Sequence, residues 1–401
     1  MPPPPRAERA PECRLSDAAL RRWVADLVGG REASGQLGSA GASGSEARWS
    51  CALTSSQAAL VAMIRRHGVT AIAHERVARG DGYPEAFVAE LQAAARRTAL
   101  TSLLVAAETR RILAALGDAG LPVLLLKGSA LGHWLYARPE LRETSDIDLL
   151  FRSRADADRA MTRLAALHYA PREASSPGDL VTFEATAVGR SGAAAGLEVD
   201  VHWRLSSWPV FAFRLSNDEL WREARPLPNV APNALGLGPV HAYLHACMHR
   251  LQNMAAGRHD HLKWLLDLHL LGRSFGAFEW DMLVDLARDR GLAGACRDGL
   301  DAAAAAFGAS APSAVTDALG DAAARESLDP GRMGDWRYVE WMNLRAFPTH
   351  RMRLRWLRQR LVPPAAYLRE RYAAASAIEG LARRAMRVIA RFGVRGGDAT
   401  D

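Results

Sequence analysis

The sequence predicts an α+β protein in which a small mixed sheet is flanked by extensive helical regions. Between residues 121 and 205, short apolar or alternating segments bounded by glycine predict strands. On both sides of this region, apolar residues recur at helical spacing. The chain has 401 residues, of which 49% are hydrophobic and 24% charged. It is long enough to bury a core, and its composition excludes disorder throughout, a collagen-like repeat and a disulfide-stapled miniprotein.

Composition divides the chain into five parts. Proline is abundant at the start, and the glycine, serine and alanine of residues 29–45 are typical of a flexible linker. The longest run of helical periodicity extends from Pro84 to Leu116, and nearly every segment after Pro239 has helical spacing. The predicted parts are a largely disordered tail and linker with a short helix at 16–28 (1–50), a helical region (51–120), the sheet (121–205), a second helical region (206–330) and a basic helical C-terminal region (331–401).

Each element of the sheet region is predicted by its own pattern. A continuous apolar run before Lys127 indicates a buried strand that ends in a glycine turn. Carboxylate and apolar residues alternate around Asp146, which indicates a strand with one polar face. Two further segments separated by a glycine-rich turn indicate paired strands. The predicted strands are 122–126, 145–151, 180–188 and 196–205, and the predicted helices are 129–136 and 154–167.

Charge and cysteine content limit the classes of function. The net charge is +7, and only two of the 51 basic residues are lysines, Lys127 and Lys263. Residues 332–395 alone carry a net charge of +11, which indicates either a nucleic-acid surface or, as we favour, a solvated helix face whose leucines pack inward. The four cysteines are far apart, and no apolar run approaches the ~20 residues that a membrane helix needs. The sequence therefore predicts a cytoplasmic protein without a membrane partner.

The strongest chemical signal is a set of aspartates on predicted strands. Asp146 and Asp148 are two residues apart, so both carboxylates project from one face of their strand. Carboxylates so close repel each other unless a cation neutralises them, and magnesium (Mg2+) prefers such oxygen ligands. Asp200 alternates in the same way on a later strand, with Glu198 as a substitute ligand and His202 as a pocket or packing residue. If the strands are neighbours, Asp146, Asp148 and Asp200 form a two-metal Mg2+ site for phosphoryl displacement.

A second signal predicts phosphate binding. A strand that ends at Gly128 and leads into a helix presents free backbone N–H groups to phosphate oxygens. Ser129 adds a hydroxyl donor, and Lys127 adds a compact positive charge unless it is a surface or ion-pairing residue. Arg142, four residues before the first aspartate, is a further candidate for a triphosphate. These four residues are the predicted nucleotide-binding set.

At these residues the sequence resembles the nucleotidyltransferase superfamily of DNA polymerase beta type, whose mark is a Gly-Ser turn, a downstream Asp-x-Asp and a later third Asp. The 16 residues between Ser129 and Asp146 are more than the superfamily usually has. This gap is typical of a narrower group, the bacterial "nucleotidyltransferase family protein" group, which the chain resembles over roughly residues 55–275. The segments that carry this narrower resemblance are 126–131, 145–150, 197–203 and 262–268.

The resemblance implies a sheet of nucleotidyltransferase type and a transfer reaction. A nucleoside monophosphate moves from a nucleoside triphosphate such as ATP to an acceptor hydroxyl or phosphate, and pyrophosphate is released. Asp146 and Asp148 would bind both magnesium ions, while Asp200 would bind the catalytic ion and accept the proton of the acceptor. The acceptor, a small molecule, a peptide or an RNA, is not implied. The alternative is a non-catalytic nucleotide- or RNA-binding protein with the same fold.

The helical region after the sheet adds two features. His241, His245 and His249 recur every four residues on a predicted helix. Because no HExxH motif is present, we expect them to pack or to line the acceptor side of the cleft rather than to bind zinc. Lys263 and Asp267 are four residues apart on another predicted helix, which predicts an ion pair between them.

Overall fold

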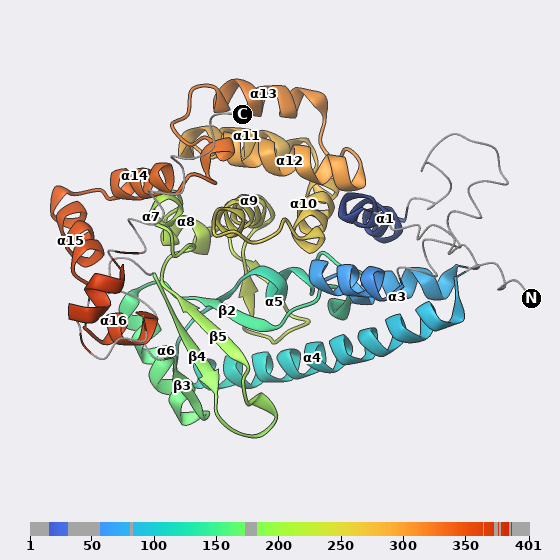
Figure 1. Cartoon of the computed structure of the whole chain (residues 1–401), viewed down its shortest axis with the longest axis horizontal. Helices are drawn as coiled ribbons and strands as arrows, with labels where there is room; N and C mark the ends of the chain where they lie inside the picture. The colour runs from blue at the N-terminus through green and yellow to red at the C-terminus, as the bar shows by residue number, and fades with distance from the viewer. Residues whose placement is uncertain are drawn as a thin grey trace, which may run out of the picture.

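The computed structural model has a seven-stranded mixed sheet covered by helices, which confirms the predicted α+β class (Figure 1). The structure describes residues 16–30, 57–80, 83–172, 183–363, 365–372, 376, 378–384 and 386. Most of the predicted tail and linker lies outside these residues. Within it, the predicted short helix is confirmed as α1 (Asp17–Gly29), which begins after Ser16, whose hydroxyl accepts a hydrogen bond from the Ala19 N–H.

The sheet has the strand order β3-β4-β5-β2-β1-β7-β6. At its centre β2 and β5 run parallel, with Asp148 opposite Asp200, and β4 pairs antiparallel with β5. Each of the four predicted strands has a counterpart among these. The strands are β1 (Leu124–Leu125), β2 (Asp146–Leu150), β3 (Tyr169–Pro171), β4 (Glu184–Gly189), β5 (Glu198–His202), β6 (Arg225–Pro226) and β7 (Leu235–Gly236).

The sheet extends beyond the predicted boundary at residue 205. β7 pairs in parallel with β1, and β6 pairs antiparallel with β7, so two segments of the second helical region complete one edge. Two-residue strands are too short for side-chain alternation to reveal them in a sequence. The predicted helix 129–136 is also shorter than expected, because α5 (Lys127–Leu131) ends at Leu131 and turns follow it.

The two faces of the sheet bury different residues. The apolar residues of β2 and β5 that alternate with the carboxylates pack against α4 (Glu85–Asp118) and α6 (Arg154–Ala166). These residues are Ile147, Leu149, Val199 and Val201. Because successive side chains of a strand point to opposite faces, this packing holds the carboxylates on the other face. A one-residue slip of either strand would bury carboxylates in the apolar layer.

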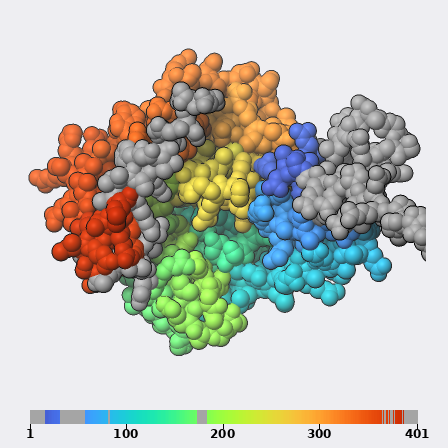
Figure 2. All heavy atoms as spheres, in the orientation of Figure 1, coloured from blue at the N-terminus to red at the C-terminus, as the bar shows by residue number. Residues whose placement is uncertain are grey.

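Helices α9 (Pro239–Ala255) and α10 (Leu262–Ser274) lie over the carboxylate face, and α11 to α13 lie beyond them (Figure 1). The N-terminal helices and the C-terminal helices lie at opposite ends of the molecule (Figure 2). Residues 57–67 are helical. The remaining helices are α3 (Thr70–Arg79), α7 (Pro209–Ala212), α8 (Asn217–Arg222), α11 (Ala277–Arg290), α12 (Ala293–Phe307), α13 (Ser313–Ala323), α14 (Trp336–Ala346), α15 (His350–Leu361) and α16 (Ala365–Tyr372), with 3-10 turns η1 (Pro139–Leu141), η2 (Gly192–Ala194) and η3 (Pro330–Arg332).

The basic C-terminal region is helical over its described part, but its leucines do not all pack inward. In α15, Trp356 is buried, whereas Leu354 and Leu361 are 67% and 71% exposed. The expectation of an inward leucine face is therefore wrong for these two residues. α15 is held to the body through Trp356 and through Arg360, whose guanidinium lies 2.8 Å from the Glu340 carboxylate.

The described helices include none that is both long and apolar enough to cross a lipid bilayer. Cys247 and Cys296 are buried free thiols. Cys13 and Cys51 lie outside the described residues.

His67 connects the stability of this fold to pH. The side chain is buried, and its Nδ1 accepts a hydrogen bond of 3.2 Å from the backbone N–H of Leu262, the first residue of α10. Only a ring with an unprotonated Nδ1 can accept this bond. Burial, with a smaller contribution from Arg21, lowers the pKa of His67 to about 4. Because the unfolded chain binds this proton near pH 6.5, folding becomes less favourable as the pH falls from 6.5 to 4.

We expect the free energy of unfolding to decrease between pH 7 and pH 4.5, with roughly 1–2 kcal/mol of the decrease due to His67. Urea denaturation at the two pH values measures it. His67→Gln keeps an acceptor but cannot be protonated, so it should show a smaller decrease. His74→Gln, on the neighbouring α3, is the matched control and should behave like the parent. Equal decreases in all three proteins would refute this assignment.

Candidate active site

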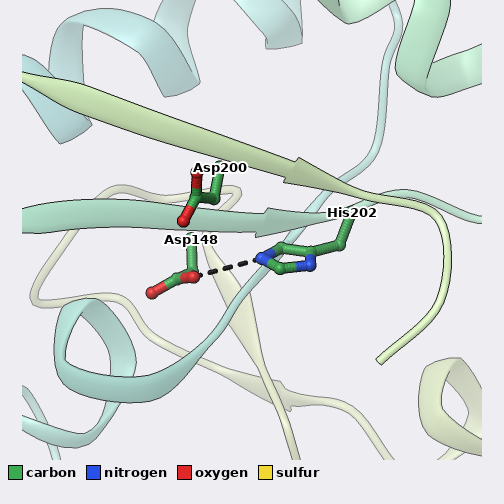
Figure 3. A group of neighbouring side chains, drawn as sticks. All are labelled: Asp148, Asp200 and His202. Carbon is green, nitrogen blue, oxygen red and sulfur yellow. Dashed lines mark hydrogen bonds and ion pairs between the residues drawn. The ribbon is translucent and has the colours of Figure 1, made fainter. Parts of the chain in front are cut away.

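The pairing of β2 with β5 brings two of the three predicted aspartates together. Asp148 lies opposite Asp200 in the parallel register. Together with His202 they offer ligand atoms that all lie within 4.8 Å of one another (Figure 3). Among the described residues this group does not include Asp146, which lies opposite Glu198 at the start of the strand pair. Glu198 itself is ion-paired with Arg172.

Asp148 is the centre of a buried charge network. The Nζ of Lys127 lies 2.5 Å from Asp148 Oδ1, and His202 Nε2 lies 3.1 Å from the same oxygen. The other ring nitrogen of His202 lies 3.2 Å from Glu184 Oε2, which is an ion-pair distance without hydrogen-bond alignment. Asp148 is 1% exposed and His202 is 2% exposed, so solvent hardly screens these charges.

These contacts determine the charges at neutral pH. Burial raises the pKa of Asp148, but Lys127 and His202 lower it by more, so that the carboxylate stays ionised. Burial lowers the pKa of His202, whereas its contacts with the Asp148 and Glu184 carboxylates raise it to about 9. Burial likewise opposes the charge of Lys127, and Asp148 reverses the effect and raises the pKa of the ammonium. Two protein cations therefore balance Asp148 and Glu184.

Asp146 and Asp200 are the less balanced carboxylates of this face. Asp200 Oδ1 accepts a hydrogen bond of 2.6 Å from the Thr186 hydroxyl, and neither aspartate has an ion-pair partner in the described ranges. Burial, and then the charge of Asp148, raises the pKa of both carboxyl groups. A divalent cation beside Asp148 and Asp200 would reduce this repulsion. The carboxylate oxygens fit a hard cation, and a ring nitrogen of His202 belongs to the same group of possible ligand atoms.

Gly128 and Ser129 hold the turn after β1 against β2. The Ser129 hydroxyl donates a hydrogen bond of 3.2 Å to the backbone carbonyl of Asp146. A Cβ atom on Gly128 would lie 2.1 Å from Thr144 Oγ1, so any larger residue would displace the Thr144 side chain. Lys127 has a positive φ of 50°, an uncommon conformation for a residue other than glycine. The turn is thus built so that the Lys127 side chain can reach Asp148.

Arg142 lies against this turn and is bound by Asp267 of α10. Its Nε and one terminal nitrogen donate to the two oxygens of Asp267, each at 2.7 Å, and the Tyr136 hydroxyl donates to Asp267 Oδ1 at 2.6 Å. All of Arg142 and Asp267 is buried. The bidentate pair connects the segment before β2 to α10 and commits the guanidinium to a protein carboxylate.

The predicted ion pair between Lys263 and Asp267 is wrong, because Asp267 is bound by Arg142. Lys263 has no ion-pair partner among the described residues. Its aliphatic stem packs so closely on Gly68 that a Cβ there would lie 2.6 Å from Lys263 Cδ. Burial, and then the charge of Arg142, lowers the pKa of Lys263, while Asp146 raises it. The four-residue spacing from Asp267 suggests that Lys263 is paired, and so it hides the unpaired state of this lysine. The scarcity of lysine in the chain is the sequence signal that singles Lys263 out.

Two adjoining pockets lie between the sheet and the helices above it. The aromatic pocket, whose 480 Å³ of empty space includes open solvent, is lined among others by Trp134, Trp264, Leu126, His245 and His249 and by the pair of Arg142 and Asp267. The polar pocket, about 270 Å³, is lined by Glu184, His202, Ser206, Ser207 and Gln252 together with the same two histidines. Lys127 lines both pockets and lies where they meet. Two separate binding spaces thus adjoin the residue that covers Asp148.

This arrangement places paired strand carboxylates, a Gly-Ser turn and a lysine under a helical cover. The chain matches the family model described as "Uncharacterised nucleotidyltransferase" over residues 54–308, which is more than half of its length. The protein belongs to this nucleotidyltransferase family. The resemblance found in the sequence is confirmed, and the family match reaches further, to the end of α12. No curated protein and no solved structure matches this nucleotidyltransferase chain.

We expect the buried pair of Arg142 and Asp267 to be a major source of stability at the nucleotidyltransferase site. Asp267→Asn leaves a buried guanidinium without a counter-charge and should lower the free energy of unfolding by about 3 kcal/mol. Asp285→Asn breaks the exposed pair with Arg288 and should cost less than about 0.5 kcal/mol. Urea denaturation of the two variants and the parent compares them, and equal effects would contradict this expectation.

Proposed function

We propose that the protein is a magnesium-dependent nucleotidyltransferase that moves a nucleoside monophosphate from a nucleoside triphosphate to an acceptor and releases pyrophosphate. The observation that carries the proposal is the facing pair Asp148 and Asp200 beneath Lys127, in a chain of this family. Phosphoryl transfer needs positioning and charge neutralisation more than covalent help from the protein. Facing carboxylates beside a buried ammonium offer both.

Asp148 and Asp200 would hold the magnesium ion, and Asp146, on the same strand face, would contribute to a second one. When bound, magnesium supplies positive charge to the phosphate oxygens. The Lys127 ammonium lies 2.5 Å from Asp148 Oδ1, and its N–H groups that do not donate to Asp148 would bind phosphate oxygens. Ser129 fixes the backbone of Asp146, so its proposed role is to position the strand rather than to bind phosphate through its hydroxyl.

In the proposed reaction the acceptor oxygen attacks the α-phosphorus and the bond from that phosphorus to the bridging oxygen of the β-phosphate breaks. Pyrophosphate leaves with the electron pair of the broken bond. The proton of the acceptor hydroxyl passes to the carboxylate of Asp200. The hydrogen bond from Thr186 occupies one oxygen of Asp200 and orients the other. A carboxylate held in this way suits a general base.

We further propose that Lys263, rather than Arg142, is the second cation for the triphosphate. Arg142 is bound on both nitrogens that face Asp267, whereas Lys263 carries its charge near Asp146 without an ion pair in the described part of the chain. Asp146, Glu143 and Asp267 balance this charge only from a distance, so a ligand anion in direct contact with Lys263 would stabilise it further. A triphosphate over the aspartates would supply that anion.

Substitution of the paired aspartates tests the proposed chemistry. Asp148→Asn and Asp200→Asn should each reduce nucleotide transfer at least about a thousandfold, because neither amide can neutralise a cation. Pyrophosphate release from the four nucleoside triphosphates, measured with a panel of small-molecule, peptide and RNA acceptors, gives the rate. Removal of magnesium with a chelator should reduce the transfer rate of the parent protein to the level of these variants.

Glu198→Gln is the matched control, since Glu198 shares the strand face but is paired with Arg172. It should retain activity within about threefold. Turnover retained in a purified, folded Asp148→Asn/Asp200→Asn double variant would rule out the proposed mechanism. Nucleotide binding by the parent without pyrophosphate release, across the whole panel, would instead indicate a non-catalytic nucleotide-binding protein.

Lys263→Met should separate activity from stability. Loss of the ammonium should lower kcat/KM for the triphosphate by about 10- to 100-fold, while the melting temperature stays equal or rises because a partly buried charge without an ion-pair partner is removed. Arg273→Met, an exposed basic residue of the same helix, is the control and should change neither. A lower melting temperature with unchanged kcat/KM would show that Lys263 is structural.

A further inference from the structure

The three histidines of α9, His241, His245 and His249, have different surroundings in the structure. His241 is 3% exposed, and its Nε2 lies 3.4 Å from Glu219 Oε1, so it is bound within the protein. His245 is 5% exposed, yet its ring has no hydrogen-bond partner among the described residues, and it lines both pockets. A polar ring that lines a pocket without a protein partner is free to exchange hydrogen bonds with a group placed there.

His249 extends the same surface. Its ring packs edge-on against Trp264 with 5.3 Å between the ring centroids, and it lies 6.3 Å from the ring of His245. Burial, and then the charge of Lys127, lowers the pKa of His245 to about 3, and the same two causes lower the pKa of His249 well below its usual value. Both rings are therefore neutral near pH 7, and each offers one N–H donor and one nitrogen acceptor.

The lining of the aromatic pocket indicates what kind of group it receives. Trp134 and Trp264 supply aromatic surface, Leu126 adds apolar surface, and the two imidazoles supply donors and acceptors without net charge. A flat heterocycle with polar groups on its edge meets all of these features. The polar pocket has no tryptophan, tyrosine or phenylalanine in its lining. A carboxylate lines each pocket, Glu184 in the polar one and Asp267, bound by Arg142, in the aromatic one. Of the two pockets, only the aromatic one suits a nucleobase.

The position of the pocket agrees with this chemistry. Lys127 lies at the junction of the two pockets and binds Asp148, so a group in the aromatic pocket adjoins the proposed phosphate site. A nucleoside triphosphate must place its base and its phosphates in adjoining spaces. The polar pocket on the other side of Lys127 remains for the acceptor, which must approach the same phosphorus from another direction.

We propose that the aromatic pocket binds the nucleobase of the triphosphate, and that His245 and His249 select the base through hydrogen bonds to its edge. The inference rests on the proposed nucleotidyltransferase function and adds the residues that recognise the nucleotide. It assigns a role to two of the three histidines of α9 and leaves His241 as a packing residue.

A measurement on the parent protein tests the proposal without any substitution. Binding of the four nucleoside triphosphates is compared by calorimetry with binding of ribose 5-triphosphate, which has the same phosphates but no base. We expect the preferred nucleoside triphosphate to bind at least about tenfold more tightly, and binding to quench tryptophan fluorescence. Equal affinities for the base-free and base-containing ligands would overturn the proposal.

Variants then locate the contacts. His245→Phe and His249→Phe keep an aromatic ring but remove the hydrogen-bonding groups, so each should weaken the preferred nucleoside by about tenfold and reduce discrimination among the four bases. The probes are the nucleosides themselves, without phosphate or magnesium. His241→Gln is the matched control on the same helix and should bind them as the parent does. If His245→Phe does not fold, His249→Phe decides the question.

The outcomes separate this inference from the proposed function. Unchanged nucleoside binding in both phenylalanine variants, or an effect confined to the KM of the acceptor, would overturn the base-binding assignment while transfer activity persists. Glu198→Gln lies outside both pockets and should bind nucleosides as the parent does. If transfer is absent in the parent but nucleoside binding depends on His245, the catalytic proposal fails and the pocket assignment stands.

Discussion

The parallel register of β2 and β5 is the constraint on which the rest of the site depends. It buries Ile147 and Val199 in the apolar layer against α4 and α6, and this packing leaves Asp148 and Asp200 side by side on the opposite face. Carboxylates brought together under helices repel each other. Lys127 and the imidazolium of His202 reduce this repulsion, since both neutralise Asp148.

A second buried pair connects this sheet to its cover. Arg142 precedes β2 and Asp267 belongs to α10, so their bidentate contact fixes the helix relative to the strand that carries the aspartates. His67 supports the same helix at its first turn. The covering helices α9 and α10 are thus held by polar contacts as well as by apolar packing. The pockets between sheet and cover depend on this spacing.

The sequence predicts the parts of the site that follow from side-chain alternation. Asp148 and Asp200 face each other because period-2 patterns identify a strand and its polar face without knowledge of the tertiary fold. The partners of charged side chains do not follow from such patterns. Asp267 lies four residues from Lys263 but binds Arg142, which is distant in sequence. Helical spacing identifies the neighbours of Asp267 on its own helix. Its stronger, bidentate partner Arg142 comes from the segment before β2, which helical spacing cannot reveal.

Short strands and exposed apolar residues also cannot be predicted from the sequence. β6 and β7 have two residues each, and their place at the sheet edge depends on pairing with β1 rather than on a local pattern. Leu354 and Leu361 have the spacing of an inward helix face but lie on the outside of α15. Which face of an amphipathic helix meets the core is decided by packing, and here Trp356 meets it.

The order of the strands in the sheet has a consequence for how the protein is made. β2 is synthesised well before its parallel neighbour β5, and β1 pairs with β7, which comes later still. Non-local pairings of this kind form slowly because a long chain segment must close before they gain any contact energy. During translation Asp146 and Asp148 therefore emerge from the ribosome before any strand that can complete their face. The chemistry of the site becomes available only when this whole segment of the chain folds together.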